Sequence, residues 1–139
     1  MNKKQSTPVR ISFVHFLRSV LLSILVMFIV MFPTALLELS ESESQMISIA
    51  YVIINMLVSI VVTIYSAYVI NQTYEIRDAR KITLIASAYL VISIIIIELI
   101  SYISGAGLSL LSDLIDVIIF YGISVWKIKD NVVPVVAAS

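Results

Sequence analysis

The chain has 139 residues, of which 60% are hydrophobic and 13% charged, and its nine Lys and Arg residues balance nine Asp and Glu residues. This composition is too apolar for a water-soluble domain, in which about a quarter of the residues are charged. The zero net charge and the scattered basic residues argue against nucleic-acid binding. Cysteine is absent and His15 is the single histidine, so we expect no disulfide, no metal site built on thiolates or histidines, and no cofactor.

Four apolar segments, separated by short polar breaks, account for most of the chain. A bilayer core about 30 Å thick requires roughly 20 mostly apolar residues in a helix. We predict apolar spans at 19–37, 46–70, 82–103 and 108–126. Strands are excluded, because an open sheet leaves backbone groups unpaired in hydrocarbon and these segments are too long and too few for a closed barrel.

The predicted fold is an all-α integral membrane protein, a four-transmembrane-helix bundle made of two consecutive helical hairpins with short loops. We expect a single membrane domain over residues 1–139. Its predicted helices cover about 9–37, 46–70, 82–103 and 108–127, and the predicted loops are 38–45, 71–81 and 104–107. The first apolar run is too long for a signal peptide and lacks a small-residue cleavage motif, so we expect it to be retained.

The basic residues predict the orientation of the bundle. All nine fall in the N-terminal tail, the loop 71–81 or the C-terminal tail: Lys3, Lys4, Arg10, Arg18, Arg77, Arg80, Lys81, Lys127 and Lys129. The positive-inside rule therefore places both termini in the cytoplasm and the loops 38–45 and 104–107 outside. Residue usage that is rich in isoleucine, tolerates lysine and asparagine and includes few glycines is typical of AT-rich prokaryotic genomes, so we expect a prokaryotic plasma membrane.

The stretch 9–17 leads into the first apolar segment. It contains Arg10, and Arg18 follows it directly. We interpret this stretch as an interfacial lead-in, in which both arginines extend toward lipid headgroups. A regulatory lipid contact is the alternative.

Polar residues recur on one face of each predicted helix when successive residues are placed 100° apart. The face of the first helix carries Ser12, His15, Ser19, Ser23 and Thr34, and that of the second carries Ser48, Asn55, Ser59, Thr63 and Ser66. Small hydroxyl residues allow close helix packing and hydrogen bonds between helices, which is the ordinary interpretation. A hydrated pathway through the bundle, or between copies, is the alternative.

Three acidic residues lie unexpectedly inside the predicted spans. Glu98 and Asp113 are nearly equidistant from the turn at residues 105 and 106, so we expect them at similar depth, and Asp116 follows one turn later. No basic residue lies in this half of the membrane, so the carboxylates either hold protons or bind a hard cation. Asn55 is the best candidate to join this proton or cation site.

A helix-capping role is the alternative for the two aspartates. Ser112 could cap a short fourth helix, with Asp113 and Asp116 in its first turn facing water.

The sequence does not indicate an enzyme. Asp113 and Asp116 form a D-x-x-D pair, but the accompanying residues of membrane phosphotransferases are missing, and no nucleophile, zinc or phosphate-loop motif is found. Two functions remain. The first is a small non-catalytic subunit, accessory or interaction component of a membrane complex, which binds other membrane subunits or copies of itself. The second is a small oligomeric transporter or ion-conducting protein that uses Glu98, Asp113 and Asp116.

Overall fold

The computed structural model describes residues 2–36 and 41–132. It contains four α-helices in chain order: α1 Pro8–Ala35, α2 Glu41–Thr73, α3 Ala79–Ile103 and α4 Leu110–Lys127. The described residues form no strand beyond an isolated bridge between Lys4 and Tyr74. The all-helical prediction is confirmed.

Three of the helices, α1, α2 and α3, are long and apolar enough to cross a membrane. The helix α4 has 18 residues and includes Asp113, Asp116 and Lys127. Each of the other three helices has an 18-residue apolar stretch with at most two charged residues, whereas α4 has three in its 18 residues. That α4 also crosses the membrane therefore stays a prediction.

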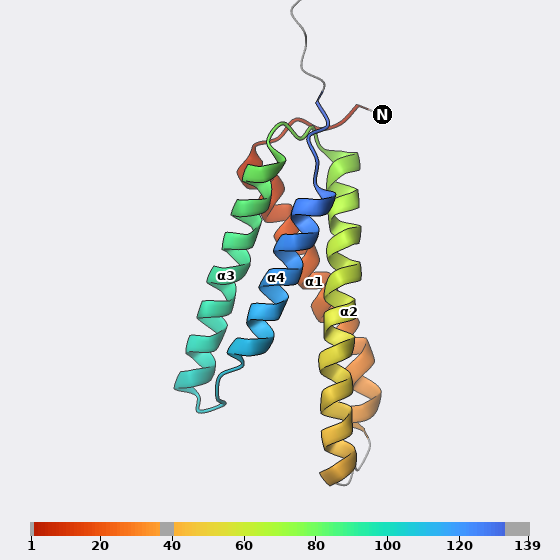
Figure 1. Cartoon of the computed structure of the whole chain (residues 1–139), viewed down its shortest axis with the longest axis vertical. Coiled ribbons are helices and arrows are strands. Elements are labelled where there is room, and N and C mark those ends of the chain that lie inside the picture. Colours follow the sequence, from red (N-terminus) through yellow and green to blue (C-terminus); the bar gives the residue numbers. More distant parts are fainter. Residues whose placement is uncertain (1, 37–40, 133–139) are drawn as a thin grey trace, which may run out of the picture.

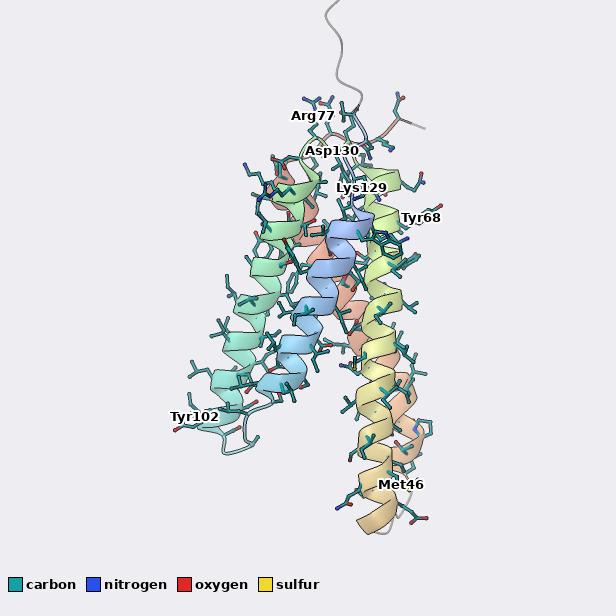
Figure 2. All side chains as sticks on the ribbon, in the orientation of Figure 1. Met46, Tyr68, Arg77, Tyr102, Lys129 and Asp130 are labelled. Carbon is teal, nitrogen blue, oxygen red and sulfur yellow. The ribbon has the colours of Figure 1, made fainter. Side chains whose placement is uncertain are left out.

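The four helices form two hairpins that lie side by side (Figure 1). The helix α1 packs against α2 and α3, and α4 packs against the same two helices. The helices α1 and α4 therefore occupy one diagonal of the bundle. The described parts of both chain termini lie at one end, which we call the termini end, and the α3–α4 loop lies toward the opposite, or far, end (Figure 1). Figure 2 shows Arg77 and Asp130 at the termini end, and Met46 and Tyr102 toward the far end.

Local chemistry explains where the helices begin. At the start of α1, the Thr7 hydroxyl accepts a hydrogen bond from the Arg10 amide at 3.3 Å, and Pro8 occupies the first turn. At the start of α3, the Asp78 carboxylate accepts one from the Lys81 amide at 2.9 Å. Both are N-caps, which satisfy amides that have no partner within the helix.

Helix boundaries differ from the predicted ones at several ends. The helix α2 runs from residue 41 to 73 instead of 46 to 70, so residues 41–45 of the predicted outer loop are helical, and 38–40 lie outside the described residues. An apolar run marks the length that faces lipid, and polar residues continue the helix beyond it. The helix α4 begins at Leu110 and not at 108, because Ser109 is its N-cap and has non-helical backbone angles (φ −116°, ψ 32°). The turn before it includes Gly105 (φ 75°) and Gly107 (φ 85°), whose left-handed conformations glycine adopts readily.

The packed core lies near the termini end. Among the described residues, every buried one except Glu98 lies either in the half of its helix nearest that end or, as Ile76 and Ile128 do, just beyond a helix at that end. One apolar cluster is formed by Ile11, Ala67, Ile70, Ile76, Ile82 and Ile128, and a second by Phe16, Ala86 and Phe120. Toward the far end, large apolar side chains such as Ile29, Ile53 and Ile96 are exposed, as expected of surfaces that face lipid.

Backbone and side-chain hydrogen bonds fasten both tails at the termini end. The Lys4 amide donates to the Thr73 carbonyl at 2.8 Å, and the Glu75 amide donates to the Lys4 carbonyl at 3.0 Å. The Asn131 amide group donates to the carbonyls of Asn71 and Tyr74, both at 3.0 Å. The end of α2 and the loop that follows it thus bind both tails.

Candidate functional site

Glu98 and Asp113 meet around the hydroxyl of Ser109, the residue before α4. Ser109 Oγ lies 2.5 Å from Glu98 Oε1 and 3.3 Å from Asp113 Oδ2. The Ser109 backbone amide also donates to the Glu98 carboxylate, at 3.1 and 3.2 Å to its two oxygens. Glu98 is buried and Asp113 is partly buried. These contacts fasten the loop 104–109 to α3.

Asp116 lies on a different side of α4, facing α2. Its carboxylate accepts hydrogen bonds from Asn55 Nδ2 at 3.4 and 3.5 Å and from Ser59 Oγ at 3.4 Å. Strong hydrogen bonds of these types measure about 2.7–3.2 Å, so the bonds to Asp116 are long and weak. No basic side chain in the described part of the chain forms an ion pair with Asp116.

A cleft of about 210 Å³ opens beside Asp116, between α1, α2 and α4. Its apolar wall includes three methionines, Met27, Met31 and Met56. The Tyr51 side chain also lines the cleft, and its hydroxyl oxygen is buried with no hydrogen-bond partner among the described residues. The cleft therefore combines a weakly bonded carboxylate with a hydroxyl that has no partner.

The structure thus divides the predicted carboxylate site into two. Asn55 pairs with Asp116, whereas Glu98 and Asp113 share Ser109. Within residues 2–36 and 41–132, no three acidic or histidine side chains are grouped closely enough to hold a metal ion. A single cation bound by all three carboxylates is not supported by this arrangement.

The capping alternative for the aspartates also needs correction. The N-cap residue of α4 is Ser109 and not Ser112, and Asp113 lies in the first turn. Ser112 instead donates its hydroxyl hydrogen bond back to the Ser109 carbonyl, at 2.9 Å. Asp116 is one turn further along, beside Asn55, because the helix begins three residues earlier than that alternative required.

His15, which the sequence places only on the polar face of the first helix, occupies the centre of the buried polar network near the termini end. The His15 side chain is 0% exposed. Its Nδ1 lies 2.8 Å from Ser66 Oγ of α2, and its Nε2 lies 2.9 Å from Ser124 Oγ of α4. The imidazole also stacks on Phe120, with ring centroids 5.0 Å apart. One imidazole therefore joins three helices.

A row of polar residues on α2 leads from the Asp116 cleft to His15. Asn55 and Ser59 contact Asp116, Thr63 is buried, and Ser66 bonds His15. Successive members are three or four residues apart, so they share one face of α2. The predicted polar face of α2 thus contacts α1 and α4 between Asn55 and Ser66, whereas Ser48 is exposed and bonds the Ser44 carbonyl of its own helix.

Comparison with protein-family models finds no match to this chain, and comparisons with curated proteins and with solved structures find none either.

Proposed function

We propose that this chain is a small non-catalytic subunit or accessory component of a membrane complex, and that it binds its partner through the Asp116 cleft. A single observation carries the proposal: a half-buried carboxylate, bonded only by neutral donors at 3.4–3.5 Å, lines a cleft of about 210 Å³. The occupant we infer is a lysine or arginine side chain on a transmembrane helix of the partner.

Charge and size both favour a basic side chain. An ionised carboxylate inside a membrane pairs with an opposite charge wherever one is within reach. The Tyr51 hydroxyl, which has no partner in the described structure, adds an acceptor beside Asp116, and its ring can stabilise a cation. Pockets for small molecules usually measure about 300–1,000 Å³, so this cleft is closer in size to one side chain. The flexible methionines can adapt to a partner helix.

Both termini are proposed to lie in the cytoplasm, with α4 as a fourth crossing, in a prokaryotic plasma membrane. The support is the position of the basic residues. Those on α1, α3 and α4 all lie in the half of the helix nearest the termini end, and the others are in the tails or the α2–α3 loop. The positive-inside rule assigns such an end to the cytoplasm.

The contacts of His15 and Ser109 support a non-catalytic role. His15 is fully buried and uses both ring nitrogens in bonds to serines, so it does not reach a substrate. The Ser109 hydroxyl lies between two carboxylates and is hydrogen-bonded to Glu98.

Site-directed cross-linking tests the proposal, because the natural sequence has no cysteine. A photoreactive maleimide on Met31→Cys, in the cleft wall, is expected to capture one partner in native membranes. The same probe on Ile96→Cys, an exposed position of α3 outside the cleft, is the control and should capture lipid only. The Asp116→Asn substitution should abolish the Met31→Cys adduct, whereas Asp116→Glu should retain part of it.

Charge exchange then identifies the contact. If the partner's basic residue is replaced by aspartate, the adduct should return with Asp116→Lys. An adduct that forms equally well with Asp116→Asn would overturn the proposed role of the cleft.

A small oligomeric transporter that couples protons or cations through Glu98, Asp113 and Asp116 is the second candidate. The polar row of Asn55, Ser59, Thr63 and Ser66 favours it, because hydroxyl and amide groups in series can support a proton path from Asp116 toward His15. Reconstitution of the purified protein into liposomes tests this candidate. Proton or cation flux that is lost in Glu98→Gln/Asp113→Asn and in Thr63→Val, but kept in the exposed control Ser48→Ala, would favour transport. Absence of flux in the parent protein would exclude it.

A further inference from the structure

A groove runs along the outside of the α1–α2 hairpin, on the half of α1 nearest the termini end. It has a volume of about 480 Å³ and shares no lining residue with the Asp116 cleft. Its lining residues are Phe13, Val14, Leu17, Arg18, Leu21 and Leu22 of α1 and Tyr65 of α2. All but Arg18 and Tyr65 are purely apolar.

Arg18 brings an uncompensated positive charge into this groove. Its Nη1 atom is buried and has no hydrogen-bond partner among the described residues. None of the lining residues is acidic. A guanidinium group in apolar surroundings is stable only when an anion or several acceptors pair with it, so the groove needs an anionic occupant.

The position of Arg18 along α1 indicates which kind of anion is within reach. The 28-residue α1 is about 42 Å long at 1.5 Å per residue, close to the full thickness of a bilayer with its headgroups. Arg18 is about 15 Å along this axis from Pro8. Helical side chains tilt toward the helix N-terminus, so the guanidinium extends toward the headgroup level of the leaflet at the termini end.

The rest of the groove suits an acyl chain. Leu21 and Leu22 follow Arg18 toward the middle of the bilayer and continue the apolar lining. Tyr65 carries a phenolic hydroxyl, which can donate to a phosphate oxygen. An arginine binds phosphate through two parallel N–H groups, which gives a defined geometry as well as charge.

We propose that this groove binds one anionic phospholipid from the leaflet at the termini end. The phosphate is bound by the Arg18 guanidinium and the Tyr65 hydroxyl, and one acyl chain lies along Leu17, Leu21 and Leu22. A lipid with net negative charge is preferred over a zwitterionic one, because it has no ammonium group to oppose Arg18. This inference does not depend on the partner proposed for the Asp116 cleft.

Native mass spectrometry of the full-length protein, released from nanodiscs of equal parts phosphatidylglycerol and phosphatidylcholine, tests the proposal. We expect the parent protein to retain one phosphatidylglycerol per chain. Arg18→Gln should reduce this retention at least tenfold, and Arg18→Lys should reduce it less. Arg10→Gln is the matched control, because Arg10 is an exposed arginine on the same helix that does not line the groove, and it should retain the lipid.

A second variant separates loss of lipid from loss of folding. Leu21→Trp changes an exposed residue, leaves Arg18 intact and fills the groove, so it should also lose the bound phosphatidylglycerol. Equal retention in Arg18→Gln and Arg10→Gln, or in Leu21→Trp and the parent protein, would overturn the proposal. So would retention of phosphatidylcholine at the same level as phosphatidylglycerol.

Discussion

His15 of α1 and Ser124 of α4 are hydrogen-bonded at 2.9 Å although their helices lie on a diagonal of the bundle and do not adjoin. The other ring nitrogen of His15 bonds Ser66 at 2.8 Å. The imidazole therefore fills the centre of the bundle and connects helices from both hairpins. Removing it should affect the whole packed half of the molecule and not one helix pair.

We expect His15→Ala to lower the free energy of unfolding by about 2 to 4 kcal/mol, because it leaves a cavity and removes two hydrogen bonds between helices. His15→Phe preserves the stacking on Phe120 and fills the cavity, so its effect should be smaller, about 1 kcal/mol. Thermal unfolding in detergent, followed by the fluorescence of Trp126, measures both changes. Ser48→Ala, at an exposed hydroxyl, should change stability by less than about 0.5 kcal/mol. Equal effects of His15→Ala and Ser48→Ala would show that the central network contributes little.

Asn131 offers an isosteric test of the C-terminal attachment. Asn131→Asp keeps the side-chain oxygen that accepts a hydrogen bond from the Ile76 amide at 2.8 Å. It replaces the NH2 group, which donates to the carbonyls of Asn71 and Tyr74, by a carboxylate oxygen that cannot donate to them. We expect a local destabilisation of about 1 to 3 kcal/mol and faster hydrogen exchange over residues 74–78. Asp130→Asn is the control with the opposite charge change, since its amide oxygen can still accept from the Ala79 amide. Similar exchange rates in the two variants would contradict this role of Asn131.

Substitution of alanine for glycine should change the free energy of unfolding in opposite directions at Gly107 and Gly122. Gly107 has a φ of 85°, so Gly107→Ala should destabilise the protein by about 1 kcal/mol. Gly122 lies within α4, and a Cβ there meets no atom within 4 Å, so Gly122→Ala should stabilise it by about 0.5 to 1 kcal/mol. Unfolding of the two variants under identical conditions gives the comparison, and a shift of the same sign in both would refute it.

Asp116 should matter for binding and not for folding. Its hydrogen bonds are long, so Asp116→Leu should leave thermal stability unchanged or raise it, by up to about 2 kcal/mol, while it abolishes partner capture. Thermal unfolding and the Met31→Cys cross-link, measured on the same variant, separate the two effects. Marked unfolding of Asp116→Leu would mean that the carboxylate is a structural element of the bundle.

Cysteine labelling can decide whether α4 crosses the membrane. Single cysteines at Asn2, Ala106 and Lys129 are treated with a membrane-impermeant maleimide on intact cells. We expect labelling at Ala106 alone, with Asn2 and Lys129 reacting only after permeabilisation. Labelling of Lys129 together with Ala106 would place α4 on the outer surface instead.

The helical architecture could be predicted because a bilayer leaves few alternatives for long apolar segments. The extent of α2 could not, since hydropathy does not register its polar ends at 41–45 and 71–73. Counting residues from the turn placed Glu98 and Asp113 at similar depth, and the structure brings both to Ser109. Periodicity likewise placed Asn55 on a polar face, which the structure directs at Asp116.

What the sequence did not predict depends on which helices are neighbours. The periodicity of one helix gives its polar face but not the helix that covers it. His15 was on the polar face of the first helix, yet its pairing with Ser66 and Ser124 requires the order of helices around the bundle. The separation of Asp116 from Glu98 and Asp113 has the same origin, because α4 presents different sides to α2 and α3.

The pairing of α1 with α3 has a consequence for how the protein is made. Ser12 donates to the Ile82 carbonyl at 2.9 Å, 70 residues along the chain, and the Lys4 segment pairs with residues 73 and 75. During synthesis, α1 therefore enters the membrane before α3 exists, and its polar face has only α2 and lipid around it. The N-terminal tail, by contrast, needs only residues 73–75, which precede α3 in the chain. The bonds from Ser12 to Ile82 and from His15 to Ser124 can form only after the second hairpin has been synthesised and packs against the first.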